Sequence, residues 1–336
     1  MNKLVIITSK EGISHSRVLT SLYDIFSDLE ILSFRFSNKS NPFILLNNLF
    51  QFYLLVKKYK YKTTFLFVGD LYYLGIVLPY NKRIAYNFDF NVLTDKSRKR
   101  SVLTLLSYKL KNYYPLSFFK SVTTISEIMK IEFEQHLPGK TCRILPNAFS
   151  RYPSVNLKKN YQFSLRGDKI IRILAFGHTY NKNLSKTIKI SEALVNHFEV
   201  CLTVVNDNSK IKYSSDLISI ERKYSLSDDE MEILYSESDL LLFPSLYEGF
   251  GMPIIEAAFH SLRIITSNID PMNKLLDQGP LLIEPSIHEE IPIDAVLSYL
   301  LDEYDPIPAY NSALNYSTEC VKSKYTDILS SMLNFD

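Results

Sequence analysis

The stretch SLYEGFGMPIIEA occupies Ser245 to Ala257 and follows the apolar run Leu240 to Phe243. The run predicts a buried strand, the glycines predict a loop, and Pro253 falls where the first turn of a helix accepts proline. In such a unit the glycines let the backbone approach a ligand closely, and the first amides of the helix point outward unpaired. The stretch therefore predicts an anion-binding site at the start of a helix.

Two carboxylates frame this predicted site. Glu248 lies in the loop, and Glu256 lies about one turn into the helix. Because a carboxylate repels phosphate, we expect each one to accept hydrogen bonds from hydroxyl groups, such as the vicinal pairs of a sugar or a ribose. The alternative for two isolated residues is a solvated loop glutamate and an exposed helix glutamate, which the surrounding FPSLYEGFGMPIIEA block makes less favourable.

The segment EGFGMPIIEA, Glu248 to Ala257, resembles the two-glutamate signature of the family 4 retaining glycosyltransferases. The resemblance implies the α/β fold called GT-B, with two doubly wound, Rossmann-like domains facing across a cleft and a C-terminal helix that returns to the first domain. It implies a nucleotide diphosphate sugar as donor. The first glutamate and the loop amides would hold the donor hexose, the helix N-terminus would face the diphosphate, and Glu256 would hold the ribose. The matching backbone positions are Gly249, Phe250, Gly251 and Met252.

A second loop resembles the phosphate loop of the same family. The strand predicted from Ile170 to Phe176 is followed by a glycine and the polar loop HTYNKN, residues 178–183. Family members carry an arginine and then a lysine there, and both contact the diphosphate. Lys182 matches the lysine, whereas His178 or Thr179 stands in the region of the arginine, so Lys182 and the helix amides would carry more of the charge. An ordinary loop lysine is the alternative. The donor residues carried over from this loop are Gly177, His178, Lys182 and Asn183.

Acceptor residues are predicted in the first half of the chain. The strand Leu4 to Ile7 precedes a loop that holds His15, and the strand Arg83 to Tyr86 precedes Asp89. Ligands of parallel α/β sheets bind at the carboxyl ends of the strands, so both side chains are acceptor-site candidates. A solvent-exposed histidine is the alternative for His15. Family members have a histidine immediately before this aspartate, and Phe88 stands there instead.

The two halves of the chain differ in charge. Residues 1–150 hold 21 basic and 10 acidic side chains, whereas the remainder holds 17 and 26. The first half is therefore expected to meet something anionic. A contact between the halves and a solvated basic surface are the alternatives. Nucleic acid is not expected, because no recognition motif accompanies the basic clusters.

The most apolar stretch, residues 42–56, reads PFILLNNLFQFYLLV and is followed by KKYKYK. It is too short and too polar to span a bilayer, which needs about twenty apolar residues. Two interpretations remain open, a core helix and an in-plane membrane helix with a basic, aromatic flank. Under the second, residues 57–62 and 96–100 would contact anionic lipid headgroups or a lipid diphosphate, as a peripheral contact at the inner face of the membrane.

Length and composition predict two folded domains. The chain has 336 residues, of which 46% are hydrophobic, enough for two cores. We expect an acceptor-binding domain over residues 1–150, a linker over 151–169, a donor-binding domain over 170–310, and a returning helix over 311–336. Strands and helices alternate through both halves, as in doubly wound folds.

The cysteines and the first residues of the chain indicate whether metal binding and secretion are expected. Cys142, Cys201 and Cys320 are far apart and in no metal-binding spacing, so we expect reduced thiols and no metal. Residues 1–8 enter an apolar strand without a charged lead and a cleavage site, so no secretion signal is predicted and a cytoplasmic location is expected.

The predicted function is transfer of a hexose from a nucleotide diphosphate sugar to a hydroxyl of a glycan or lipid-linked saccharide, with retention at the anomeric carbon, in cell-surface polysaccharide synthesis. Glu248, Lys182 and Asp89 are the predicted catalytic residues. A sugar-nucleotide epimerase or hydrolase of the same fold, and a non-catalytic sugar-nucleotide-binding partner subunit, are the alternatives. The second is kept open by departures from the family pattern at Phe88, His178, Ser261, Asn273 and Lys274.

Overall fold

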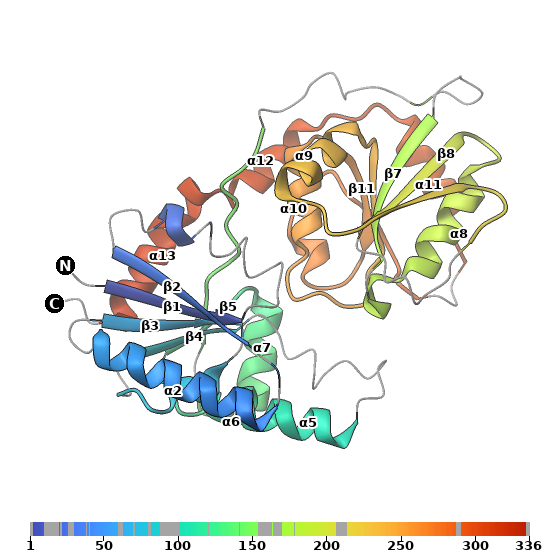
Figure 1. Cartoon of the computed structure of the whole chain (residues 1–336). Coiled ribbons are helices and arrows are strands. Elements are labelled where there is room, and N and C mark those ends of the chain that lie inside the picture. Colours follow the sequence, from blue (N-terminus) through green and yellow to red (C-terminus); the bar gives the residue numbers. More distant parts are fainter. Residues whose placement is uncertain are drawn as a thin grey trace. The chain divides into compact units, whose positions relative to one another are not determined.

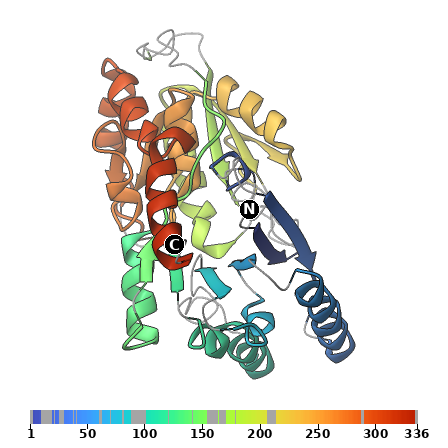
Figure 2. The same cartoon turned by 90° about the vertical axis from the view of Figure 1, so that its left-hand side faces the viewer.

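The computed structural model divides the chain into two compact units, unit 1 (Met1–Ser150 and Tyr316–Asp336) and unit 2 (Arg151–Asn315). Each unit is a parallel sheet with helices packed on it (Figures 1 and 2). The sequence analysis placed a linker over 151–169 and the returning segment from 311, whereas the chain changes units after Ser150 and again after Asn315. The structure describes residues 3–9, 20, 22–25, 30–37, 39, 41–59, 63–69, 71–79, 82–87, 101–119, 121–140, 142–153, 163, 170–177, 179–205, 214–286 and 290–333.

Unit 1 is built on a six-stranded parallel sheet of order β2-β1-β3-β4-β5-β6. Its strands are β1 (Lys3–Ser9), β2 (Glu30–Phe36), β3 (Thr63–Val68), β4 (Arg83–Asn87), β5 (Ser121–Thr124) and β6 (Cys142–Ile144). The central strands β1 and β3 contain the continuous apolar runs Leu4–Ile7 and Phe65–Val68, as is typical of parallel strands covered on both faces. In β1, Val5 pairs with Leu32 on one side and Phe65 on the other. The predicted strands of this half are confirmed.

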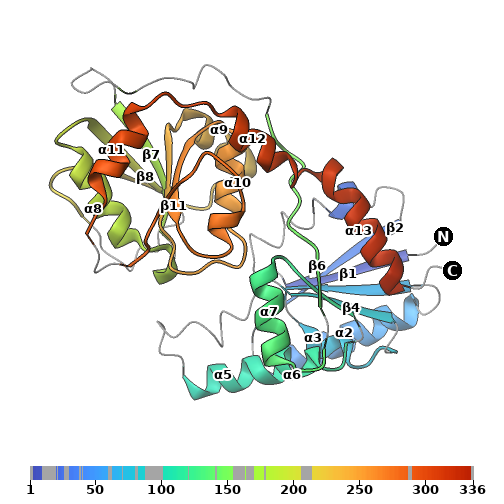
Figure 3. The ribbon, with the colours of Figure 1, turned by 180° about the vertical axis from the view of Figure 1, so that it is seen from behind.

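The helices of unit 1 cover both faces of its sheet. They are α2 (Pro42–Lys58), α3 (Tyr72–Gly75), α5 (Val102–Tyr108), the π-helix η2 (Lys109–Tyr113), α6 (Tyr114–Leu116), α7 (Glu127–His136) and α13 (Thr318–Leu333). Phe52 of α2, Leu116 of α6 and Phe133 of α7 share one core cluster with Val5 and Phe67 of the sheet. Helix α13 lies on the opposite side of the sheet from α2 (Figures 1 and 3).

Helix α13 is joined to unit 1 by two buried tyrosines. Tyr325 donates to the carbonyl oxygen of Pro146 at 2.7 Å, Tyr86 donates to that of Leu145 at 2.9 Å, and the two hydroxyl oxygens are 3.3 Å apart. Burial raises the pKa of both hydroxyls. The sequence also predicts one continuous closing helix from Tyr310 to Leu333. In the structure it is interrupted, because α12 ends at Leu314 in unit 2 and α13 begins at Thr318.

Unit 2 has a second six-stranded parallel sheet, of order β12-β11-β10-β7-β8-β9. Its strands are β7 (Ile170–Phe176), β8 (Glu199–Val205), β9 (Ser219–Lys223), β10 (Leu240–Phe243), β11 (Arg263–Ser267) and β12 (Leu281–Ile283). Its helices are η4 (Tyr180–Lys182), α8 (Leu184–Leu194), α9 (Asp228–Glu237), α10 (Met252–Phe259), η5 (Met272–Lys274), α11 (Ile293–Leu301) and α12 (Ile307–Leu314). Counted from β7, the strand order is 3-2-1-4-5-6, the order of dinucleotide-binding sheets.

Two further sequence predictions concern unit 2. The spacing of Ser227 and Glu230 predicts a capping box at the start of a helix, and α9 confirms it. A helix is also predicted from Ile287 to Leu301, whereas α11 begins only at Ile293. The short strand β12 was not predicted, because three residues carry too little periodicity to distinguish a strand from a loop.

Candidate functional site

The switch point of the unit 2 sheet lies between β7 and β10. These strands are hydrogen-bonded neighbours, and the chain winds outward from them in opposite directions. The loops that follow them are tied together: Leu246 donates its backbone N–H to the carbonyl of Asn181 at 2.7 Å, and the Asn181 side chain donates to the carbonyl of Tyr247 at 2.9 Å. In open α/β sheets, ligands bind at this edge.

Lys182 and Glu248 form an ion pair across the two loops. The Nζ and Oε1 atoms are 2.6 Å apart, and the side chains are only 9% and 12% exposed. The ammonium also lies 4.7 Å from the ring centroid of Phe243. Sequence analysis predicted both residues but not their contact. An ammonium has three donors and a carboxylate has about four acceptor sites, so the pair leaves capacity on both groups for a further ligand.

Asn183 holds the same edge together. Its backbone is left-handed at φ 54°, and its Nδ2 atom donates to the carbonyls of Pro244 at 2.9 Å and Pro285 at 2.8 Å. The Oδ1 atom of Asn183 and the Oγ atom of Ser245 are buried and have no hydrogen-bond partner in the described part of the chain. The backbone N–H of Gly177 donates to the carbonyl of Val205 at 3.1 Å, so the pairing of β7 with β8 extends to this glycine.

The glycine loop before α10 requires glycine at one position. Gly251 has φ +102°, and a Cβ atom there would lie 3.0 Å from Cδ1 of Leu275. Phe250 is buried and fixes the loop to the core. The amides of Gly251 and Met252 donate to no group among the described residues, whereas Pro253 has no N–H. Helix α10 therefore presents fewer amide donors than a helix without proline in its first turn.

Glu256 is held by a contact that sequence analysis missed. It accepts a hydrogen bond of 2.6 Å from the hydroxyl of Tyr235 in α9. The Tyr235 ring stacks on His260 at 5.2 Å, and His260 Nδ1 lies 2.8 Å from the carbonyl oxygen of Glu256. The expected hydroxyl partner of this glutamate is thus, in this structure, a tyrosine of the chain itself. The spacing of Met231 and Tyr235, both buried on α9, is the sequence signal for an inward tyrosine.

Several predicted site residues lie outside the described residues. These are His15 and Asp89 on the acceptor side and His178 on the donor side. Within the described ranges, no group of three or more His, Cys, Asp or Glu side chains is placed to hold a metal ion. No helix in the described part of the chain is long and apolar enough to cross a bilayer.

Two residues near the start of β11 have distinctive structural settings. Ser261 has φ +60°, in the region that glycine adopts without strain. The buried Arg263 guanidinium donates to the carbonyls of Tyr299 and Asp302 and lies 4.8 Å from the Tyr304 ring centroid. Arg263 therefore anchors the end of α11 to the sheet.

Comparisons with known proteins show what this chain resembles in sequence and in fold. Residues 170–302 match the family model described as Glycosyl transferases group 1. The chain is 28% identical over 141 residues to the O-antigen chain mannosyltransferase RfbU of Salmonella typhimurium, an alignment that covers 40% of this chain and 39% of RfbU. The chain thus spans less than half the length of the curated relatives it matches.

Two solved structures resemble the whole chain. The sucrose-phosphate synthase of Thermosynechococcus elongatus has a TM-score of 0.71 at 13% identity, with full coverage of both chains. WaaG, a glycosyltransferase involved in lipopolysaccharide biosynthesis, has a TM-score of 0.62 at 11% identity, covering 98% of this chain and all of WaaG. At such identities the likeness shows the fold alone. The chain has the GT-B fold, and its residues 170–302 resemble the glycosyl transferases of group 1.

Proposed function

We propose that this chain is a glycosyltransferase that moves a hexose from a nucleotide diphosphate sugar to a hydroxyl group of a glycan or lipid-linked saccharide. The observation that carries the proposal is the nearly buried Lys182–Glu248 pair at the switch point. Beside it, the backbone amides of Gly251 and Met252 donate to no group among the described residues. The family match over residues 170–302 supports the same reaction class. Because RfbU is named an O-antigen chain mannosyltransferase, we propose a role in cell-surface polysaccharide synthesis and mannose as the first hexose to test.

Each group at the switch point has a role in this proposal. The second oxygen of Glu248 accepts a hydrogen bond from a hexose hydroxyl, while Lys182 turns its remaining N–H donors toward the diphosphate. The amides of Gly251 and Met252 add positive potential at the start of α10. These donors are already in position to stabilise the negative charge that develops on the departing diphosphate. Removing one such donor from an enzyme lowers the rate by about 10²- to 10³-fold.

The reaction breaks the bond between the anomeric carbon and the phosphate oxygen and forms a bond from the acceptor oxygen to the same carbon. In a retaining transfer the acceptor attacks from the face that the diphosphate leaves, and the departing phosphate oxygen takes the acceptor's proton. Glu256, oriented by Tyr235, accepts hydrogen bonds from the ribose hydroxyls. The proposal uses no resident metal, so donor hydrolysis in excess chelator should equal that in its absence.

On the acceptor side we propose Asp89 and His15, with a cytoplasmic site of reaction. Asp89→Asn should raise the KM for the acceptor while leaving hydrolysis of the donor by water unchanged. His15→Gln should act in the same direction but less strongly, because an amide keeps one donor and one acceptor. Equal losses of transfer and of donor hydrolysis would place these residues outside the acceptor site.

Donor binding is the most direct test. A panel of nucleotide sugars that includes GDP-mannose, UDP-glucose and UDP-galactose should contain one that raises the melting temperature, by the mass-action stabilisation that any native-state ligand provides. Glu256→Gln should reduce that shift, whereas Glu237→Gln, an exposed glutamate of α9 in the same unit, should not. If no nucleotide shifts the transition and both variants behave like the parent chain, the donor site is absent.

Turnover separates the proposal from its alternatives. The expected result is transfer of mannose to a polysaccharide acceptor. The mannose in the product should have the same anomeric configuration as in the donor. A donor that stabilises the chain without hydrolysis or transfer would favour a non-catalytic partner subunit. Interconversion of the sugar without transfer would favour an epimerase.

A further inference from the structure

Helix α2 of unit 1 presents an apolar stripe to the outside. Phe43, Leu46, Phe50 and Tyr53 are spaced by three and four residues, so they share one side of the helix. They are between 58% and 83% exposed, whereas Asn48, Phe52 and Leu55 of the same helix are buried, and Leu49 and Val56 pack against the core. Surface helices of globular proteins normally carry polar side chains on that side.

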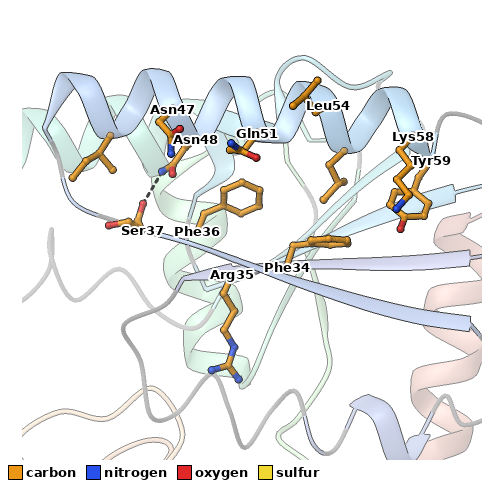
Figure 4. Close-up of a pocket in the computed structure, with 12 residues that line it drawn as sticks. Phe34, Arg35, Phe36, Ser37, Asn47, Asn48, Gln51, Leu54, Lys58 and Tyr59 are labelled. Atoms are coloured by element: carbon orange, nitrogen blue, oxygen red, sulfur yellow. Dashed lines mark hydrogen bonds between the residues drawn. The ribbon is translucent and has the colours of Figure 1, made fainter.

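The polar side chains of α2 lie instead on the flank toward the edge strand β2. A groove with a volume of about 610 Å³ runs between the two elements and is lined by Asn47, Gln51 and Lys58 of the helix and by Phe34 and Phe36 of the strand. Figure 4 shows Asn48 beneath the helix, where its Nδ2 atom donates to the carbonyl of Ser37 at 2.7 Å. Helix α2 is therefore apolar on its outer side as well as on the side that packs against the core.

Helix α5 and its continuation carry a second exposed apolar stripe. No residue of α5 is buried. Apolar residues recur there in steps of about four and are between 50% and 79% exposed; they are Val102, Leu103, Leu106, Leu110, Tyr114 and Phe118. Contacts of α3 with α2 on one side and with η2 and α6 on the other join the two stripes in one helical layer. Figures 1 and 3 show this layer along one side of the sheet.

The same segment of the chain is strongly basic. Residues 41–120 contain 13 Lys and Arg but only three acidic residues, all aspartates. Lys57 extends the apolar stripe of α2, and Lys109 follows α5 directly. An apolar surface bordered by cations matches the interface of an anionic bilayer, where side chains reach the acyl boundary and ammonium groups meet lipid phosphates.

We propose that the outer face of α2, α5 and α6, called here the α2/α5 face, docks on an anionic lipid bilayer, with the helices lying in the plane of the interface. Aromatic residues and leucines enter the headgroup and acyl boundary, and lysines contact anionic headgroups. Burying this apolar area supplies the binding energy, and the cations select the lipid. The proposal stands whether or not the chain transfers a sugar.

Sedimentation with vesicles tests the docking. The chain should pellet with vesicles of phosphatidylcholine that contain 30% phosphatidylglycerol, less with phosphatidylcholine alone, and less again in 0.5 M NaCl, which screens headgroup charge. Leu46→Gln combined with Phe50→Gln, and Leu103→Gln combined with Leu106→Gln, should each raise the lipid concentration for half-binding by about tenfold or more. Leu217→Gln combined with Ile233→Gln is the matched control, since both residues are comparably exposed in unit 2.

Charge reversal provides a second, independent measurement. Lys57→Glu combined with Lys109→Glu should reduce binding to the anionic vesicles by about tenfold, at about 1 kcal/mol for each charge near the surface. Lys322→Glu combined with Lys324→Glu changes the net charge equally on exposed positions of α13, on the other side of the sheet, and should have a smaller effect. These variants should keep the donor-induced melting shift of the parent chain, measured without vesicles.

Three results would overturn the proposal. The parent chain fails to pellet with anionic vesicles, or the α2/α5 variants pellet as the parent does. Alternatively, the chain forms a dimer that the same glutamine substitutions convert to a monomer, in which case a second copy covers the face.

Discussion

Unit 1 and unit 2 are built on parallel sheets of equal strand number, yet helix α5 of the first and helix α10 of the second use their apolar residues in opposite ways. Helix α10 of unit 2 buries five of its eight residues, whereas α5 of unit 1 buries none. In unit 2, the groups of the proposed donor site are polar and nearly buried, and they gather at the strand edge around Lys182 and Glu248. In unit 1, the exposed groups of the α2/α5 face are apolar. The comparison suggests that the first kind of site serves a small charged ligand and the second an extended surface.

The largest expected effect comes from breaking the ion pair of unit 2. Lys182→Met leaves the Glu248 carboxylate unpaired and nearly buried, which should lower the free energy of unfolding by about 3 kcal/mol. Donor hydrolysis should fall by more than 100-fold, because the proposed diphosphate contact is lost. Urea unfolding and a donor hydrolysis assay measure the two effects.

Two variants decide how that result is interpreted. Lys189→Met, at an exposed position of α8, should change neither quantity and controls for the loss of a charge. Lys182→Met combined with Glu248→Gln should recover part of the stability, because no buried charge remains, but none of the turnover. Recovered turnover in the double variant would remove Lys182 and Glu248 from the donor site and leave them a structural pair.

The glycine loop offers a comparison of one substitution in both units. Gly251 of unit 2 and Gly139 of unit 1 both have positive φ angles, +102° and +79°. A Cβ atom on Gly251 would meet Leu275 at 3.0 Å, whereas one on Gly139 would meet nothing within 4 Å. Gly251→Ala should therefore destabilise the chain by about 2 kcal/mol, and Gly139→Ala by about 1 kcal/mol from backbone strain alone. Equal values in thermal unfolding would mean that the loop before α10 relaxes around the added methyl group.

Alkaline pH tests the attachment of α13 to unit 1. Burial raises the pKa of the Tyr86 and Tyr325 hydroxyls above the ordinary value of 10.0, so the folded state holds these protons more tightly than the unfolded chain. Their contribution is complete below pH 10 and is lost as the pH rises beyond it. Tyr325→Phe should lower stability at pH 8 by about 1 kcal/mol, since the Pro146 carbonyl loses its donor.

The pH dependence of the free energy of unfolding is the second part of this test. Between pH 10 and 11, Tyr325→Phe should lose less stability than the parent chain, because one buried phenol no longer titrates. Tyr304→Phe provides the counterpart in unit 2, where burial also raises the pKa of the hydroxyl that donates to the carbonyl of Leu262. Parallel slopes for the parent chain and Tyr325→Phe would show that the Tyr325 hydroxyl has the same pKa in the folded and the unfolded chain.

The two units also differ in how much of them the sequence predicts. In unit 2, the strands β7 and β10 and the loop from Ser245 to Gly251 carry strong local signals, namely apolar runs that end at glycine and proline. The contacts of the site were beyond local reasoning, because Lys182 and Glu248 are 66 residues apart and meet only through the pairing of β7 with β10. Tyr235 was missed for the same reason.

In unit 1, the segment from Val102 to Leu116 was not predicted as helical at all. Its residues alternate between helix α5, the π-helix η2 and the proline-containing α6, so no single period runs through them. For residues 42–56, apolar content predicted a helix correctly but left core and membrane interpretations open. Which side of this helix faces outward depends on how Asn48 and Phe52 pack against the sheet, and local sequence does not determine that packing.

The smallest expected effect sharpens the role of Tyr235, which reaches the site only through Glu256. In the proposed function, Tyr235→Phe leaves Glu256 able to accept the ribose hydroxyls but no longer holds its carboxylate in place. The KM for the donor should rise about threefold with kcat unchanged, because one such hydrogen bond contributes about 0.5–1.5 kcal/mol net. Tyr224→Phe, at an exposed position before α9, is the control. If Tyr235→Phe instead lowers the KM, the tyrosine hydroxyl competes with the ribose for the carboxylate, and Glu256 must exchange one partner for the other each time a donor binds.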